Sequence, residues 1–401
     1  MANVNTRRGT IGILTGGGDV PGLNPAIRAL TVRALSEGYR VLGIRRGWAG
    51  LIECNPSADG ADDWVMDLTE EVVNKAGRTG GTFLHSSRTR PSSVPLANVP
   101  DHLRERFNGE TNDLTEVVLA NIGHLGIDVL IPIGGDDTLS YGVQLHKSGV
   151  PVIAIPKTMD NDVPGTDYCI GFSTCVTRTI AMTHALRTSA GSHERFLVIE
   201  VFGRYAGFTA LLPTMAGAAN RCVIPEHPFD IELLCELLSE DRRRNPSLYS
   251  VVLVSEGATL RGSVEMTYQD HETDMFGHKK LGGIGDLVSR ALRDVSPKYN
   301  GGRRVNSINQ RLGYLVRAGE PDALDSIVPM AFGNLAMDLI LEGVSGRLVC
   351  VRNGRYDHVP IDVVTSRKKV VDVGKFYNPG RLRPQYTRFA GLPTFIMTSD
   401  Y

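Results

Sequence analysis

Short runs of aliphatic and β-branched residues alternate with amphipathic segments along this 401-residue chain, and this alternation constrains the fold more than any other feature. The runs with the composition of buried strands are residues 11–14, 40–44, 128–133, 151–155, 196–201, 222–224 and 250–254. The segments with apolar residues at helical spacing are residues 24–36, 112–124, 173–187 and 231–242. Strands that alternate with helices form parallel sheets covered by helices on both faces. We therefore predict an α/β protein, and two successive arrays of this kind indicate two lobes.

Composition excludes several classes of function. The 43 Lys and Arg residues balance the 44 Asp and Glu residues, so the basic excess typical of nucleic-acid binding is missing and we expect no nucleic-acid partner. Apolar runs stay short of the roughly 18–20 residues that a membrane span needs, so we expect no membrane association. The six cysteines form no C-x-x-C pair, which argues against a zinc ribbon. With a polar N-terminus that lacks a signal-peptide core, these features predict a cytoplasmic protein.

Glycine-rich turns follow two of the predicted strands. Residues 16–18 are three glycines between the first strand and a helix, where backbone N–H groups and the helix dipole attract an anion. Residues 134–135 are a second glycine pair, and Asp136 and Asp137 follow it. An ordinary tight turn explains either glycine run alone. Asp136 suits Mg²⁺, which prefers hard oxygen ligands, whereas Asp137 is equally well explained as the N-cap of the following helix.

The segment Pro156-Lys157-Thr158-Met159-Asp160-Asn161-Asp162 follows another strand and combines the groups that phosphoryl transfer needs. In such a reaction a base removes the proton of the acceptor hydroxyl, a metal neutralises the phosphates, and a cation stabilises the transferred group. Asp160 is a candidate base, Asp162 a metal-side carboxylate and Lys157 the cation. Asp and Asn also favour ordinary loops, but three such loops in one chain make that explanation difficult to sustain.

Arginines stand near the same strands, and their guanidinium fork suits phosphate oxygens. They are Arg88, Arg195, Arg204 and Arg317. For any one of them a surface salt bridge is the commoner fate. A further basic group, Arg367-Lys368-Lys369, is predicted to be an exposed charge run. Residues 89–111 are rich in Pro, Ser and charge and are predicted to be a surface insertion.

The ordered set of these loops resembles the phosphofructokinase family. The matching segments are residues 11–24, 80–88, 134–138, 156–162, 165–172, 202–207 and 255–257. The resemblance implies two similar Rossmann-like lobes, each a mainly parallel sheet flanked by helices, with the active site in the cleft between them. It also implies transfer of a phosphoryl group to the 1-hydroxyl of fructose 6-phosphate, with Mg²⁺ as cofactor, in a homodimer or homotetramer with shared active sites. The implied domains are residues 1–156 with 318–365 for the phosphoryl donor, and residues 157–317 with 366–401 for the sugar phosphate.

The resemblance also assigns roles to individual residues. The implied catalytic residues are Asp160 as the base, Asp162 as a second aspartate, Lys157 and Thr158. The implied donor contacts are Gly18, Arg88, Gly135, Asp137 and Lys157. The implied metal-linked carboxylate is that of Asp136. The implied sugar-phosphate contacts are Thr158, Asp160, Phe202, Gly203, Arg204, Glu256, Tyr314, Arg317 and, donated across a subunit interface, Arg195.

Asp137 and Lys157 together bear on the identity of the donor. Family members that use ATP usually carry glycine at the position of Asp137, and many carry glycine at that of Lys157. A carboxylate at Asp137 repels and obstructs the α-phosphate of a nucleotide. Pyrophosphate ends before that point, and Lys157 offsets its charge. The resemblance is therefore to the pyrophosphate-dependent branch, which reversibly forms fructose 1,6-bisphosphate and phosphate. An ATP-dependent phosphofructokinase and a non-catalytic sugar-phosphate sensor are the alternatives.

One stretch departs from the family's pattern. An arginine usually precedes a hydrophobic strand upstream of Gly313-Tyr314, but residues 305–311 do not align cleanly with that pattern. The second phosphate contact between subunits is therefore Arg303, Arg304 or Arg311, or it is absent.

Overall fold

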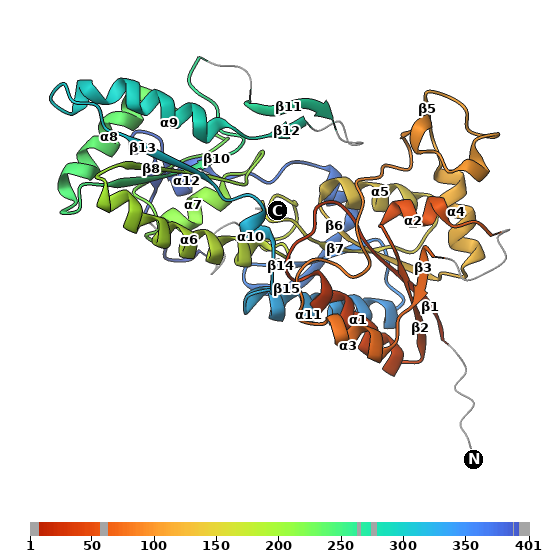
Figure 1. Cartoon of the computed structure of the whole chain (residues 1–401). Helices are drawn as coiled ribbons and strands as arrows, with labels where there is room; N and C mark the ends of the chain where they lie inside the picture. Colours follow the sequence, from red (N-terminus) through yellow and green to blue (C-terminus); the bar gives the residue numbers. More distant parts are fainter. Residues whose placement is uncertain (1–7, 57–62, 263–265, 274–278, 388, 393–401) are drawn as a thin grey trace.

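The chain folds into two α/β lobes that lie side by side (Figure 1). The computed structural model describes residues 8–56, 63–262, 266–273, 279–387 and 389–392. The parts of the two predicted domains that fall on other residues lie outside this description. Each lobe has a mainly parallel sheet with helices on both faces, which confirms the predicted α/β class.

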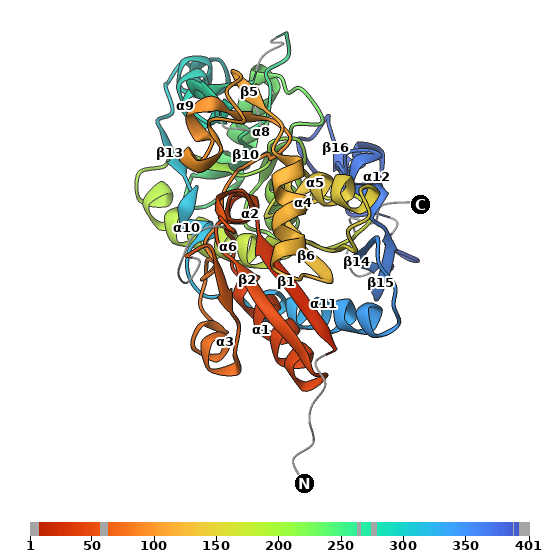
Figure 2. The same ribbon diagram turned by 90° about the vertical axis from the view of Figure 1, so that its right-hand side faces the viewer.

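The first lobe contains a seven-stranded sheet with the order β15-β14-β7-β6-β1-β2-β3. Its strands are β1 (Gly9–Thr15), β2 (Tyr39–Ile44), β3 (Val65–Asp67), β6 (Val129–Gly134), β7 (Ile153–Pro156), β14 (Arg347–Arg352) and β15 (Arg355–Pro360). Neighbouring strands pair in parallel, except that the edge strands β3 and β15 pair antiparallel. One face is covered by α1 (Leu23–Ser36), α3 (Glu70–Ala76) and α11 (Leu324–Leu341). The other face (Figure 2) is covered by α2 (Trp48–Glu53), α4 (Thr115–His124) and α5 (Asp136–Lys147).

The second lobe contains a four-stranded parallel sheet with the order β13-β8-β10-β9. Its strands are β8 (Phe196–Val201), β9 (Arg221–Val223), β10 (Ser250–Ser255) and β13 (Ser307–Arg311). Its helices are α6 (Phe172–Ser192), α7 (Phe208–Met215), α8 (Ile231–Arg244) and α9 (Ile284–Val295). The shorter elements are β4 (Val94–Pro95), η1 (Leu96–Asn98), η2 (Asp101–Leu103), β5 (Thr111–Asn112), β11 (Tyr268–Thr273), β12 (Lys279–Leu281), η3 (Ser296–Tyr299), α10 (Tyr314–Arg317), η4 (Ile361–Thr365), α12 (Val373–Phe376), β16 (Tyr377–Asn378) and β17 (Arg383–Pro384).

Each lobe is assembled from separate parts of the sequence. The chain leaves the first lobe after β7, returns to it between α10 and α11, and leaves it again after β15 to reach α12 (Figure 1). Strands β14 and β15 therefore complete the first sheet only after the chain has passed through the second lobe. The predicted division into a donor domain and a sugar-phosphate domain remains a prediction.

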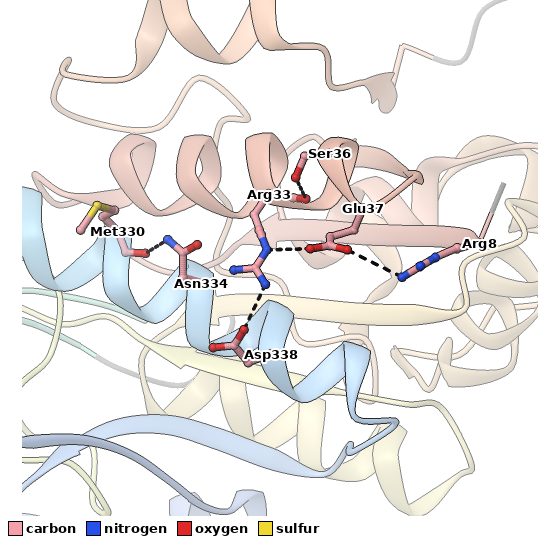
Figure 3. Close-up of polar contacts among 7 residues, drawn as sticks. All are labelled: Arg8, Arg33, Ser36, Glu37, Met330, Asn334 and Asp338. Atoms are coloured by element: carbon pink, nitrogen blue, oxygen red, sulfur yellow. Dashed lines mark hydrogen bonds and ion pairs between the residues drawn. The ribbon is translucent and has the colours of Figure 1, made fainter. Parts of the chain in front are cut away.

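Helix α11 packs closely along α1 (Figure 3). A Cβ atom at Gly333 would lie 2.9 Å from a backbone atom of α1, so glycine permits this approach. At the solvent edge, the Arg33 guanidinium lies 3.1 Å from Glu37 and 3.3 Å from Asp338, and Glu37 also lies 3.7 Å from Arg8. Exposed ion pairs contribute little stability, so apolar packing accounts for most of the contact between the two helices.

Helix α11 is long and apolar enough to cross a membrane by length and composition, with a mean hydropathy of 1.4 over 18 residues. The prediction that no segment reaches this length is therefore corrected. Half of the window is buried inside the molecule, where α11 packs on α1, α6, β7 and β14. A helix surrounded by protein is apolar on most sides, so a core helix satisfies the same criterion.

Residues 89–111 are more than the surface insertion that their composition predicts. Val94, Val99 and Leu103 are buried in the same apolar cluster as residues of α2 and α4. The overall polar composition of the segment gives no sign of these three apolar residues. They anchor the segment beside the first sheet.

Asp325, near the start of α11, holds that helix against the segment that leads into α6. The carboxylate is fully buried and accepts hydrogen bonds from the Tyr168 hydroxyl (2.6 Å) and the Gly171 N–H (2.7 Å). It also accepts bonds from the N–H (2.8 Å) and the hydroxyl (2.6 Å) of Thr174. Burial raises the pKa of Asp325 to about 6, although these bonds favour the ionised form.

We expect Asp325→Ala to lower the free energy of unfolding by about 3–5 kcal/mol, because several buried donors lose their acceptor. Asp338→Ala is the matched control on the same helix, since its exposed carboxylate pairs with Arg33 at 3.3 Å. This variant should lose less than about 1 kcal/mol. Urea denaturation measures both changes. Equal destabilisation by the two substitutions contradicts the role assigned to Asp325.

Candidate active site

A cavity of about 1430 Å³ lies between the lobes, at the carboxyl ends of strands from both sheets. In open α/β sheets this edge is where ligands bind. The cavity brings together most of the predicted site residues, namely Gly18, Arg88, Gly135, Asp136, Asp137, Lys157, Thr158, Asp160, Asp162, Phe202, Arg204, Glu256, Tyr314 and Arg317. Gly203 lies between two lining residues, and Arg195 does not line the cavity.

The glycine turn after β1 forms one wall of the cavity together with residues 80–88. Gly17 has a φ of 79°, a left-handed conformation that favours glycine. Its N–H donates to the Ser87 carbonyl (3.0 Å), and its carbonyl accepts from the Ser86 hydroxyl (2.5 Å). A side chain at Gly16 would collide with Thr138 in α5. The two loops are therefore held together, with backbone directed at the cavity.

Asp136 and Asp137 form the first turn of α5, which begins one residue after the glycine pair. The N-cap position is taken by Gly135, not Asp137. The explanation of Asp137 as a helix cap is therefore wrong, because its side chain lies inside the first turn. Both carboxylates line the cavity at a helix N-terminus, where the dipole stabilises negative charge.

Lys157 is a buried cation directly beside this wall. Its side chain is 4% exposed, and its ammonium donates to the Gly18 carbonyl at 2.6 Å. Burial lowers the pKa of Lys157 to about 7, and the nearby guanidinium groups of Arg317 and Arg88 lower it further. The charged form of Lys157 is therefore destabilised in the protein alone, and an anionic ligand would stabilise it.

The loop that carries Asp160 and Asp162 is shaped by the residue between them. Asn161 has a φ of 55°, and its side chain donates to the Asp167 carbonyl (2.9 Å) and accepts from the Cys169 N–H (2.8 Å). This pinning turns both flanking aspartates toward the cavity. Residues of the αL region cost energy unless the surroundings hold them.

The two aspartates are destabilised as anions. The pKa of Asp160 rises to about 7, mainly through burial and then through Glu256. The pKa of Asp162 also rises to about 7, through burial, Asp160 and Asp136. Asp160 nevertheless accepts a bond from the Arg204 N–H (3.3 Å) across the cleft. A carboxylate poised near neutrality is suited to removing a proton.

The loops after β8 and β10 form the wall of the second lobe. Gly203 has a φ of 120°, and its carbonyl accepts from the Gly257 N–H at 3.1 Å, which places Arg204 and Glu256 at the cavity. Burial raises the pKa of Glu256 to about 7, while Arg204 opposes the rise. The Phe202 ring lies 5.0 Å from the Arg317 guanidinium.

Arg317 joins the two walls. It ends α10 and donates to the Asp19 carbonyl at 2.7 Å, and a Cβ at Gly18 would collide with its guanidinium. Tyr314, at the start of α10, is 77% exposed and lines the cavity.

The remaining predicted arginines divide into two groups. Arg195 precedes β8, whereas the cavity lies past the other end of that strand, roughly 20 Å away at about 3.3 Å per residue. It does not reach the cavity of its own chain. Arg304 pairs with Asp294 on the surface, whereas Arg311 lines the cavity.

The cavity also contains residues that the motifs did not single out. They include Asp19, Arg46, His85, Ser86, Ser87 and Glu200. Glu200 is 2% exposed, and its carboxylate lies 2.8 Å from the Arg311 guanidinium and accepts from the Gly285 N–H at 2.8 Å. The sequence signal that could have identified Glu200 is its position as the one carboxylate inside the apolar run of residues 196–201. The φ values of 58° at Arg46 and 59° at His85 have no sequence signature.

The donor set for a metal is sparse. Among the described residues, no group of three or more His, Cys, Asp and Glu side chains is arranged to hold a metal ion. Mg²⁺ is commonly held by one or two carboxylates together with substrate phosphates. Asp136 and Asp162 fit that arrangement. They are close enough for the negative charge of Asp136 to raise the pKa of Asp162.

Comparison with known proteins accounts for this combination of loops. A model of the phosphofructokinase family matches residues 10–340. The chain belongs to the phosphofructokinase family. This phosphofructokinase is 36% identical to the pyrophosphate–fructose 6-phosphate 1-phosphotransferase of Dictyoglomus thermophilum, over 90% of the chain and 95% of the relative. It is 35% identical to the ATP-dependent 6-phosphofructokinase 3 of Streptomyces coelicolor, over 90% of the chain and 96% of the relative.

The fold of this phosphofructokinase is shared with solved structures. The crystal structure of the pyrophosphate-dependent phosphofructokinase of Marinobacter aquaeolei matches with a TM-score of 0.70 at 19% identity, over 94% of this chain and 89% of that one. The predicted pair of Rossmann-like lobes is thereby confirmed. Because relatives of nearly equal identity are named for different donors, the choice of donor depends on the residues of this chain.

Proposed function

We propose that this phosphofructokinase transfers a phosphoryl group reversibly from pyrophosphate to the 1-hydroxyl of fructose 6-phosphate. The observation that carries the choice of donor is that Asp137 and Lys157 both line the same cavity. Lys157 supplies a buried cation for a short polyanion. Asp137, in the first turn of α5, opposes the further phosphate of a nucleotide by charge and volume.

In the forward reaction, Asp160 accepts the proton of the sugar's 1-hydroxyl. The sugar oxygen then forms a bond to the nearer phosphorus of pyrophosphate as the bridging P–O bond breaks, which releases orthophosphate. Lys157 and Arg88 stabilise the phosphate charge, Gly18 and Gly135 complete the donor side, and Thr158 contacts the transferred group in the transition state. Asp136 and Asp162 would hold Mg²⁺, which would neutralise part of the charge on the phosphates.

The sugar phosphate occupies the other end of the cavity. Glu256, Phe202 and the Gly203 backbone contact the sugar, and Arg204, Tyr314 and Arg317 contact its oxygens and 6-phosphate. Because Arg195 cannot reach its own cavity, it completes the site of a second subunit in a homodimer or homotetramer. We place the enzyme in the cytoplasm, with no nucleic-acid or membrane partner.

The donor is tested by measuring turnover of fructose 6-phosphate with pyrophosphate and with ATP, side by side. We expect a strong preference for pyrophosphate and a weakening of its use when Asp137→Gly and Lys157→Gly are combined, because the cation is lost and space opens. A preference of the wild type for ATP contradicts the proposal. Asp160→Asn is the control: it should abolish turnover and retain binding of fructose 6-phosphate. An inactive wild type that still binds the sugar phosphate indicates a sensor.

The pH profile of kcat/KM for pyrophosphate should be bell-shaped around pH 7. Below about 7 the carboxylates of Asp160 and its neighbours become protonated, so the base is lost. Above about 7 Lys157 loses its charge, so the donor binds less well. Initial rates at low pyrophosphate measure the profile, and Lys157→Met should remove its alkaline limb. An alkaline limb that persists in this variant contradicts the assignment.

Arg311 lines the cavity of its own chain, so of the three arginines considered for a contact between subunits we propose that it contacts the 6-phosphate within its own subunit. Its substitution by Met should raise KM for fructose 6-phosphate roughly 10- to 100-fold, as expected for loss of a charge-assisted hydrogen bond. Arg304→Met is the matched control and should leave KM unchanged, because Arg304 is spent on surface Asp294. Steady-state kinetics decide, and equal KM values for the two variants contradict the choice of Arg311.

A further inference from the structure

The basic run 367–369 is exposed, as its composition predicts, at two of its three residues but not at the third. Lys369 is 5% exposed, whereas Arg367 and Lys368 are exposed. The run lies in residues 366–372, here called the strap, which connects η4 to α12. Helix η4 packs on α5 in the first lobe, and Tyr377 after α12 donates to the Cys222 carbonyl (2.8 Å) in the second. The strap therefore crosses between the lobes (Figure 1).

Lys369 contacts the segments that directly follow the two loops that carry the proposed chemistry. Its ammonium donates to the Thr166 carbonyl at 2.7 Å, four residues after Asp162. The same ammonium lies 5.6 Å from the Phe208 ring, four residues after Arg204. Burial lowers its pKa to about 8, while nearby Asp167 and Asp162 oppose the fall. A buried cation is costly unless neighbouring groups are held around it.

The strap makes two more contacts with the loop of the second lobe. The Lys368 ammonium lies 3.4 Å from the Tyr205 ring centroid, a cation–π contact next to Arg204. The Val371 N–H donates to Glu226 at 2.7 Å, and the same carboxylate oxygen accepts from the Gly207 N–H at 2.9 Å.

A second cavity, of about 240 Å³, shows how near the strap lies to the reacting groups. Its walls include Lys368 and Lys369 together with Asp136, Asp162 and Tyr205. These last three residues also line the main cavity, so the strap lies directly behind the carboxylates. The Arg204 N–H donates to Asp160 and so joins the two loops directly. The strap contacts the chain beside each of these loops and thus supports both sides of this hydrogen bond.

We propose that Lys369 and Lys368 are positioning residues of the active site. Lys369 fixes the loop of Asp160 and Asp162, and Lys368 fixes the loop of Arg204, so that the base and the sugar-phosphate wall stay aligned while each belongs to a different lobe. This inference rests on the proposed function, because alignment is measured through the transfer reaction. It is independent of the donor, since neither lysine lines the main cavity.

The test compares Lys369→Met and Lys368→Met with Lys375→Met, a control on neighbouring α12 whose exposed ammonium pairs with Asp372. Wild type is assayed with fructose 6-phosphate and whichever of pyrophosphate or ATP it uses. Lys369→Met should lower kcat roughly 10- to 100-fold, as expected for a small displacement of a reacting group, with KM values within about twofold. Lys368→Met should raise KM for fructose 6-phosphate about fivefold or more, with kcat retained. Lys375→Met should match wild type.

Two further measurements separate positioning from stability. The melting temperature of Lys369→Met should fall by a few degrees at most, because a buried ammonium is removed but the Thr166 carbonyl loses this donor, and kcat is measured well below it. Lys369→Arg, which keeps the charge and a donor, should recover part of kcat. Wild-type kcat in Lys369→Met, or a kcat that falls only with the melting temperature and is not recovered by Arg, overturns the proposal. A wild type that turns over fructose 6-phosphate with neither donor overturns the proposed function instead.

Discussion

Like charges crowded into one desolvated cleft are the constraint on which this site depends. Asp160, Asp162 and Glu256 all have a raised pKa because burial and neighbouring carboxylates oppose their ionisation. Lys157 has a lowered pKa because burial and neighbouring guanidinium groups oppose its charge. In the protein alone, the ionised forms of the carboxylates and of Lys157 are therefore both destabilised. A polyanion beside the cations stabilises the charged form of Lys157, and a proton donor beside the carboxylates protonates them. The proposed reaction therefore uses charges that the fold has already placed in the cleft.

The fold keeps these groups together through backbone geometry that is anchored far from the chemistry. Asn161 holds a left-handed turn between the two aspartates because its amide bonds two backbone groups of the next segment. That segment is secured in turn by Asp325, whose buried carboxylate receives the Tyr168 hydroxyl and the Gly171 N–H. Loss of such anchors is expected to affect the cleft as well as stability, because the anchors position the residues that hold the reacting loop.

Much of the fold and of the site follows from local patterns. Strands such as β8 and β10 agree with their predicted ranges within a residue, because buried parallel strands are continuous apolar runs. The predicted site residues converge because they follow carboxyl ends of such strands. Long-range partners leave no local trace: Lys369 reaches Thr166 across more than two hundred positions, and nothing in a run of three basic residues shows that one is buried.

Arg317 shows how the two ends of the cleft are linked. Its guanidinium lies against the Asp19 carbonyl on one wall and the Phe202 ring on the other. Its field lowers the pKa of both Asp160 and Lys157. The first effect favours the ionised base, whereas the second disfavours the charged clamp. A bound anion cancels the repulsion between the two cations, so it restores the charge of Lys157. In the proposed reaction, binding of the phosphoryl donor would therefore complete the charge pattern that transfer requires.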